Sequence, residues 1–281
     1  MSVINKPVPP VVETDEVTVV VATRNRPDRL RETVPHHRAT TIVVDNASDQ
    51  PLHVPGAEVV RLDENIGAAA RNTGALRART PFVAFADDDS YWAPGSLARA
   101  VEIFRAHPEA ALLTGRVLIG PDGRLDPVSA GMAATPIGTP AGAAGPSVLG
   151  FLSCAVVVRR SAFLAAGGFN PRLFVYGEEA LLAMDLAAAG HQLSYVPELV
   201  VRHFPEPAGR DNRARARREA RNRALTALLR RPPAVAARTL AEVARTQPAA
   251  LPHLVRDLGW ALRHRRRLPE PVELALRRLA G

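Results

Sequence analysis

The chain has 281 residues, of which 47% are hydrophobic and 23% charged, and this balance excludes a disordered protein and favours a large globular domain, alone or with a helical appendage. No apolar stretch reaches the roughly 18 residues of a membrane span, and the first ten residues lack the apolar core of a signal peptide. The single cysteine, Cys154, excludes an internal disulfide framework and favours a reducing cytoplasm, with the thiol as a small core residue.

The net charge of +8 is unevenly distributed. Residues 1–200 carry 17 basic and 21 acidic side chains, whereas residues 201–281 carry 19 basic and 7 acidic ones. The only lysine is Lys6, so almost all of the positive charge comes from arginine. The basicity therefore belongs to the C-terminal segment and says little about the first 200 residues.

The first half of the chain alternates between strand and helix patterns. β-Branched and apolar runs predict strands at 17–23, 40–46, 57–63 and 82–86, and a helical pattern covers 66–79. Strands that alternate with helices indicate parallel βαβ units, and hence an α/β fold with a doubly wound sheet. Ligands of such sheets bind at the carboxyl ends of the strands.

The second half continues the pattern and then changes. Residues 120–149 are rich in Gly, Pro, Ala and Ser, which favours a mobile loop over a site. Beyond Pro205 the chain is helical and arginine-rich, with several proline breaks. Between 93 and 190 we expect a helix at 93–108, strands at 110–119 and 153–159, and helices at 161–168 and 178–190.

Three consecutive carboxylates follow the strand at 82–86, in the segment FVAFADDDSYW. They repel one another and are costly to desolvate together, so they need a counter-charge. A divalent cation is the natural one, because Mg²⁺ and Mn²⁺ favour carboxylate oxygens and bridge to substrate phosphates. Gly-rich phosphate-binding signatures are missing, so a metal–diphosphate site at this strand end fits best.

Six ordered segments give the sequence a wider resemblance. Over about 16–205 it resembles the bacterial inverting family 2 glycosyltransferases with the GT-A fold. The segments are VTVVVATRNRPDRL, TIVVDNAS, ENIGAAARNTGALRA, FVAFADDDSYW, RRSAFLAAGGFN and VYGEEALLAMDLAAAG.

The resemblance implies an architecture and an activity. We expect a flexible N-terminal segment (1–15), a GT-A domain with a Rossmann-like, mostly parallel mixed sheet (16–205) and an arginine-rich helical extension (206–281). The implied reaction is metal-dependent transfer of a sugar from a nucleotide-diphospho-sugar, such as a UDP- or dTDP-sugar, to an acceptor hydroxyl. Direct displacement with a carboxylate general base would invert the anomeric centre.

The resemblance also implies residue roles. The metal, Mn²⁺ or Mg²⁺, would bind Asp89 with Asp87 and His203. Glu179, beside Glu178, occupies the position of the catalytic base, and the helix N-terminus favours its anion. Where the family more often has Glu-Asp, this chain has two glutamates, which leaves open which one acts. The nucleotide-sugar would contact Ala22, Thr23, Arg24, Asn25, Asp45, Asn65, Gly67, Arg71, Asp87 and Asp88.

Each role has a structural alternative. Asp45 could end a strand in a turn, and the two glutamates could be ordinary residues of a helix N-terminus. His203 could be a buried or solvent-facing histidine without a ligand role. Trp92 could stack on an acceptor sugar or pack in the core.

Two other functions compete with glycosyl transfer. A sugar nucleotidyltransferase shares a similar sheet and acidic site, but its Gly-rich loop is missing from ATRNRPDRL. A basic nucleic-acid-binding protein would use the C-terminal arginines, yet that segment lacks interleaved aromatics and any zinc, RRM or KH signature, so no nucleic acid is expected.

The acceptor stays open between a glycan, a lipid-linked intermediate, a peptide and a small natural product. The segment WALRHRRRL places Trp260 and Leu262 beside arginines, which suits peripheral contact with an anionic membrane at its cytoplasmic face. Ion pairs between the extension and the acidic first domain are the alternative use of these arginines.

Overall fold

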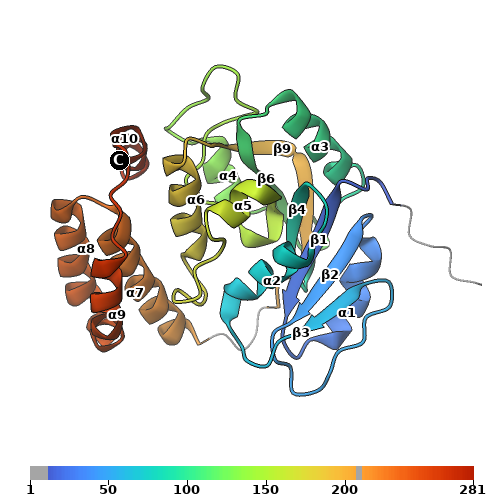
Figure 1. Cartoon of the computed structure of the whole chain (residues 1–281), viewed down its shortest axis with the longest axis horizontal. Helices are drawn as coiled ribbons and strands as arrows, with labels where there is room; N and C mark the ends of the chain where they lie inside the picture. The colour runs from blue at the N-terminus through green and yellow to red at the C-terminus, as the bar shows by residue number, and fades with distance from the viewer. Residues whose placement is uncertain (1–11, 207–210) are drawn as a thin grey trace, which may run out of the picture.

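A computed structural model describes residues 12–206 and 211–281 of the chain. Within the first range, nine strands form one mixed sheet (Figure 1). Most of the predicted N-terminal segment, 1–11, lies outside the described residues. The strands are β1 (Val17–Thr23), β2 (Thr40–Asp45), β3 (Glu58–Arg61), β4 (Phe82–Asp87), β5 (Ser90–Trp92), β6 (Ala110–Ile119), β7 (Arg124–Leu125), β8 (Val156–Arg159) and β9 (Gln192–His203).

The strand order is β3-β2-β1-β4-β8-β6-β9-β5, with β7 paired to β6. β1 pairs in parallel with β2 and with β4, β2 pairs in parallel with β3, and β6 pairs in parallel with β9. These parallel pairs contain most of the paired residues. The sheet is mixed because β8 runs antiparallel between β4 and β6. The carboxyl ends of β1, β2 and β4 therefore share one edge, as expected for parallel strands.

Helices cover both faces of the sheet. Along β1, Val19 and Val21 face one buried cluster while Val20 faces the other, as the two-residue period of a strand requires. Helices α1 (Pro27–Thr33) and α3 (Ser96–Ala106) pack on the first face. The second face is covered by α2 (Ala70–Arg77), α5 (Arg160–Ala165) and α6 (Glu178–Ala188).

The 120–149 segment, expected to be a loop, contains β7 and the helix α4 (Pro127–Ala133). Pro127 occupies its first turn, and the side chain of Asp126 accepts hydrogen bonds from the amides of Val128 and Ser129. The expected helix at 66–79 begins as a 3₁₀ turn, Gly67–Ala69, before α2. β5 and β9 were not predicted. β5 has only three residues, and β9 mixes polar residues into its apolar pattern.

The C-terminal helices form a third cluster against the sheet domain (Figure 1). Leu173 and Leu181 of the sheet domain pack into this cluster, and Nη2 of Arg230 lies 2.9 Å from Oδ2 of Asp185. Among the described residues, no helix is both long and apolar enough to cross a bilayer. These helices are α7 (Asn212–Arg230), α8 (Pro233–Thr246), α9 (Leu251–Arg263) and α10 (Glu270–Leu279).

Asn222 of α7 holds the 172–177 loop, which leads into α6. Its buried amide nitrogen donates to the carbonyls of Leu173, Val175 and Tyr176 at 2.8, 3.0 and 2.8 Å. Phe174 and Tyr176 adopt the left-handed conformation, with φ of +64° and +72°. Non-glycine residues adopt this conformation only where surrounding contacts impose it, so Asn222 stabilises a strained loop.

Replacing Asn222 by alanine should lower the free energy of unfolding by about 1–3 kcal/mol, because it leaves loop carbonyls without their donor. Urea unfolding measures this change. Asn212→Ala, at the exposed start of α7, is the matched control and should change stability far less. Equal losses in the two variants would contradict the role of Asn222.

Candidate active site

A pocket of about 410 Å³ opens at the carboxyl end of β4. The sheet edge contributes the three aspartates, α2 contributes Arg71, and the N-terminus of α6 contributes two glutamates. We call it the carboxylate pocket; its lining residues are Ala22, Arg26, Arg71, Asp87, Asp88, Asp89, Leu152, Ser153, Cys154, Val175, Tyr176, Glu178, Glu179, His203 and Arg215.

Two arginines and a histidine contact the three aspartates. Arg71 forms an ion pair with Asp87. Nη1 of Arg26 lies 2.6 Å from Oδ1 of Asp88 and 3.3 Å from Oδ2 of Asp89. Nε2 of His203 lies 3.2 Å from Oδ1 of Asp89. The counter-charge that the sequence requires is thus supplied by side chains from three separate parts of the fold.

Burial and these contacts shift the pKa values of the cluster. Burial raises the pKa of Asp88 to about 6, although Thr23 donates to it at 2.7 Å and Arg26 opposes the rise. Burial also disfavours the anion of Asp89, but hydrogen bonds and charge from His203 and Arg26 lower its pKa below the ordinary value. Burial lowers and Asp89 raises the pKa of His203, and the net shift is upward.

The pocket contains a set of donor atoms that suits a hard divalent cation. Three potential ligand atoms, one each from Asp87, Cys154 and His203, lie within 4.8 Å of one another. Asp89 contacts the same histidine. Carboxylate oxygens are the ligands that Mg²⁺ and Mn²⁺ prefer, and imidazole is a common ligand of transition metals. Burial raises the pKa of the Cys154 thiol well above its ordinary value, so this side chain stays neutral. Asp87, Asp89 and His203 therefore fit the expected metal.

The two glutamates at the start of α6 differ in environment. Glu179 accepts hydrogen bonds from Oγ of Ser153 at 2.7 Å and from the amide of Gly177 at 3.2 Å. Glu178 is only 4% exposed, and its Oε2 has no hydrogen-bond partner among the described residues. Burial and the charge of Glu179 raise the pKa of Glu178 to about 8, although Arg71 opposes the rise. Burial therefore favours the protonated form of Glu178 over its anion.

Several residues with predicted nucleotide contacts lie at the same sheet edge but do not line this pocket. Asp45 is fully buried and accepts hydrogen bonds from Nη1 of Arg61 at 3.0 Å and from the amide of Ser48 at 2.9 Å. Asn65 accepts a hydrogen bond from Asn46 at 2.9 Å. Asp45 therefore makes the turn that was its structural alternative, and its contact with a base stays a prediction.

Three other predicted nucleotide contacts stabilise loops beside the pocket. Gly67 has φ of +64°, and a Cβ there would lie 2.3 Å from the carbonyl oxygen of Phe174, so only glycine fits. The exposed Arg24 donates to the carbonyl of Ala47, and Asn25 donates to Asp49. Their contacts with a ligand stay predictions.

Trp92 lies in the core. Its exposed fraction is 2%, and its indole N–H donates to the carbonyl of Phe85 at 3.2 Å. A ring buried in the core presents no face to an acceptor sugar, so the structure corrects the stacking role considered from the sequence.

Sequence reasoning missed Arg26, Ser153, Tyr176 and Arg215. Arg26 directly precedes Pro27 at the start of α1, which places its guanidinium beside the end of β4. Its position in the quoted motif RNRPD was the available signal. Arg215 belongs to α7, and its guanidinium lies 4.9 Å from the ring centre of Tyr176, a contact that no local pattern predicts.

A second, mostly apolar pocket of about 420 Å³ adjoins the first, and Glu179 lines both. α4, the 148–151 segment and Leu279 of α10 form its apolar walls. We call it the apolar pocket. Glu179 thus stands where a polar, charged pocket meets an apolar one.

Comparison with known proteins finds matching sequences. The family model for glycosyl transferase family 2 matches residues 18–165. A pre-mycofactocin glycosyltransferase of Mycobacterium tuberculosis is 34% identical over 202 residues, covering 67% of this chain and 42% of the relative. An N-acetylglucosaminyl-diphospho-decaprenol L-rhamnosyltransferase of the same species is 31% identical over 152 residues, covering 46% of this chain and 49% of the relative. The chain thus spans less than half the length of these relatives.

Solved structures share the fold. A mannosyltransferase from Pyrobaculum calidifontis in complex with GDP-Man and Mn²⁺ aligns with a TM-score of 0.58 and 20% identity, covering 98% of this chain and 90% of that one. Residues 1–349 of TarS from S. aureus in complex with UDP-GlcNAc align with a TM-score of 0.59 and 18% identity, covering 92% and 83%. The chain has the GT-A fold of these proteins, and C-terminal helices are present.

The raised pKa of Glu178 predicts a pH-dependent stability. The ordinary pKa of a glutamate is 4.5, and that of Glu178 in the folded chain is about 8. Between these two pH values the folded chain keeps a proton that the unfolded chain has released. Stability should therefore fall as pH rises through this window, by up to about 1.4 kcal/mol per pH unit, and the loss should be complete above it.

Glu178→Gln removes this titration. The melting temperature of the variant relative to that of the wild type should therefore increase as pH rises from 5 to 8.5. Thermal melts at several pH values measure the difference. Glu109→Gln, at an exposed position, should keep a constant offset from the wild type. A constant offset for Glu178→Gln as well would contradict the buried, protonated state.

Proposed function

Because the chain belongs to glycosyl transferase family 2, we propose that it transfers a sugar from a nucleotide-diphospho-sugar to an acceptor hydroxyl, with inversion at the anomeric carbon. One observation carries this proposal. Glu179 lies between the carboxylate pocket, which suits a donor diphosphate, and the apolar pocket, which suits an acceptor. A base at that boundary can reach a hydroxyl that points toward the donor.

Asp87, Asp89 and His203 would hold the Mn²⁺ or Mg²⁺ ion in the carboxylate pocket. When bound, the metal would supply charge neutralisation for the leaving diphosphate. Arg71 and Arg215 line the same pocket and add fixed positive charge toward a phosphate oxygen. UDP- or dTDP-sugars are the proposed donors, and the GDP-Man and UDP-GlcNAc complexes of the structural neighbours support the class of ligand.

Glu179 would take the proton of the acceptor hydroxyl as its oxygen attacks the anomeric carbon. The bond between that carbon and the diphosphate oxygen breaks on the opposite face, and the nucleoside diphosphate leaves. Ser153 and Gly177 hold the Glu179 carboxylate by hydrogen bonds, which fixes its orientation. Glu178 is buried, its pKa is raised to about 8, and it does not line the apolar pocket, so we assign the base to Glu179, which lines both pockets.

The acceptor would place an apolar portion in the apolar pocket. Met132, Val148 and Phe151 line this pocket and offer it no charge. A lipid-linked intermediate or a small natural product fits such walls better than an unmodified glycan or a polar peptide. The name of the rhamnosyltransferase relative, which specifies a diphospho-decaprenol, supports a lipid-linked acceptor.

We still propose contact with an anionic membrane, but through other residues of α9 than Trp260. Trp260 is half-buried beside His264, and Arg172 lies over its ring, so it does not face a bilayer. The exposed face of α9 instead presents Val255 and Leu262, with exposed fractions of 67% and 54%. We propose a cytoplasmic protein that uses this face at the membrane, which co-sedimentation with anionic vesicles tests.

Loss of a side chain that only hydrogen-bonds to a metal ligand typically weakens metal binding by roughly 10–100-fold. Because Asp89 is a proposed ligand itself, Asp89→Asn should weaken divalent-dependent donor binding by at least as much. Titration of Mn²⁺ and a UDP-sugar, followed by thermal shift, measures this. Asp122→Asn, on an exposed turn, is the control. Undiminished activity of Asp89→Asn in the presence of a chelator would refute the metal role.

Glu179→Gln should lower kcat by about 10²–10⁴-fold and leave donor affinity nearly unchanged, because the base acts only in the chemical step. Glu178→Gln should have a milder effect. Release of nucleoside diphosphate, followed by a coupled assay, measures turnover, and release of inorganic diphosphate would instead indicate nucleotidyl transfer. The reverse ranking of the two variants, or a product of retained configuration, would overturn the mechanism.

A further inference from the structure

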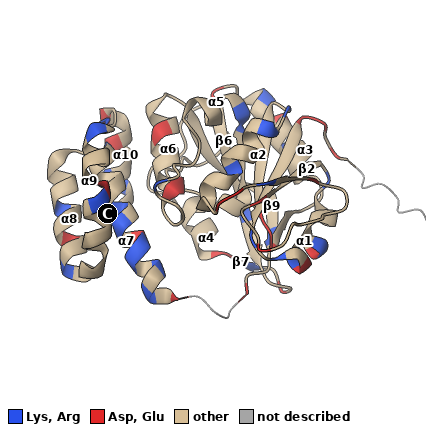
Figure 2. Cartoon of the chain, turned by 60° about the horizontal axis from the view of Figure 1, so that its bottom comes forward, with Lys and Arg blue, Asp and Glu red and all other residues tan. Residues whose placement is uncertain are grey.

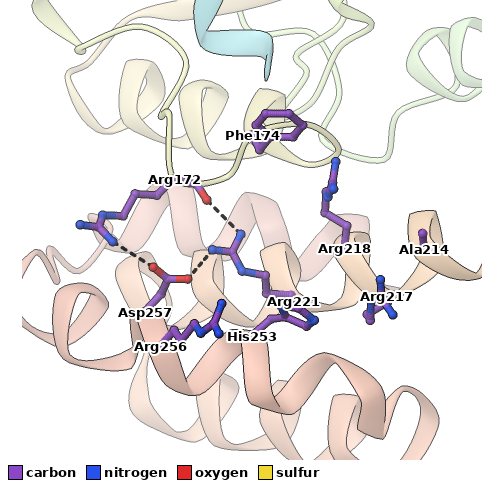
Figure 3. A pocket seen from close by; sticks show the side chains of 9 residues that line it. All are labelled: Arg172, Phe174, Ala214, Arg217, Arg218, Arg221, His253, Arg256 and Asp257. Carbon is purple, nitrogen blue, oxygen red and sulfur yellow. Dashed lines mark hydrogen bonds and ion pairs between the residues drawn. The ribbon is translucent and has the colours of Figure 1, made fainter. Parts of the chain in front are cut away.

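A basic pocket lies on the other side of the 172–177 loop from the carboxylate pocket. Phe174 lines the basic pocket, whereas Val175 and Tyr176 line the carboxylate pocket. We call it the arginine pocket; its volume is about 330 Å³, and its lining residues are Arg172, Phe174, Ala214, Arg217, Arg218, Arg221, His253, Arg256 and Asp257 (Figure 3). The loop, α7 and α9 therefore build it together.

The helical period explains how α7 supplies this wall. Ala214, Arg217, Arg218 and Arg221 recur at the three- and four-residue spacing of one helix face. Arg215 points away from that face toward Tyr176. Figure 2 shows that basic residues gather along α7, so positive charge continues along this helix from one pocket to the other.

The arginine pocket has an excess of positive charge. Its lining holds five arginines and a histidine but only one carboxylate, Asp257. Asp257 already pairs with Arg172 at 3.0 Å and with Arg221. In the part of the chain that the structure describes, no carboxylate lies within 4.0 Å of a guanidinium nitrogen of Arg217, Arg218 or Arg256.

The geometry favours an anion with several oxygens. The guanidinium of Arg218 lies 4.8 Å from the ring centre of Phe174, and Nη1 of Arg221 donates to the carbonyl of Arg172 at 2.9 Å, so both groups are held in place (Figure 3). Planar guanidinium groups bind phosphate oxygens through paired hydrogen bonds. Unpaired like charges in one pocket also repel, and an anion relieves that repulsion.

We propose that the arginine pocket binds a phosphate or diphosphate group, without a metal, at a site separate from the donor diphosphate. Two sources share this chemistry, a free diphosphate or nucleotide and the diphosphate of a lipid-linked molecule. The proposal depends neither on the metal ligands nor on Glu179, so it stands apart from the proposed reaction.

Calorimetric titration of the full chain with inorganic pyrophosphate, in EDTA, tests the site. Arg217→Gln and Arg256→Gln should each weaken binding by about tenfold or more, because each removes a charged donor. Neither should lower the melting temperature without ligand, since each relieves repulsion. Arg245→Gln, an equal charge change at an exposed position of α8, should bind as the wild type does.

Asp89→Asn should leave pyrophosphate binding in EDTA unchanged, which separates this site from the donor site. Equal weakening in Arg245→Gln, or full binding in both Arg217→Gln and Arg256→Gln, would overturn the proposal. Farnesyl diphosphate separates the two sources. Affinity about tenfold above that of pyrophosphate indicates a lipid-linked diphosphate, and equal affinity indicates a free one.

Discussion

The charge balance at the end of β4 is the constraint on which the site depends. Three adjacent aspartates are tolerated there only because Arg26, Arg71 and His203 reach them. These side chains come from the start of α1, from α2 and from the end of β9, so the sheet must assemble before they can contact the aspartates. Burial and the charge of Glu179 raise the pKa of Glu178, and Arg71, which is already paired with Asp87, only partly opposes this rise.

The 172–177 loop connects this charge cluster with the C-terminal helices. Its left-handed residues would relax if they were free, yet Asn222 binds three of its carbonyls and the amide of Ala68 donates to a fourth at 2.6 Å. Arg215 and Arg218 lie over its two aromatic rings. The loop therefore separates the carboxylate pocket from the arginine pocket while it positions the first turn of α6.

Sequence patterns predict the features that local physics determines. β-Branched runs that end in polar residues predict β1, β2 and β4, and the structure confirms these strands. The partner of Arg26 could not be predicted, because it depends on the turn at Asn25, whose φ is +57°. The difference between Glu178 and Glu179 is equally hidden, since successive helix residues point about 100° apart and only packing shows which one is buried. Trp92 belongs to a short strand whose inward face only the sheet identifies.

The amide of Asn222 limits how freely this chain can exchange parts with its relatives. If the chain were modular, the C-terminal helices could be replaced to change the choice of partner while the sheet domain kept its chemistry. Here α7 of the C-terminal helices carries the amide donor that holds the 172–177 loop before α6, so a chimaera with foreign helices would lose these hydrogen bonds. An exchanged helix would need a carboxamide at the same place to hold this loop, so changes in the two parts are coupled.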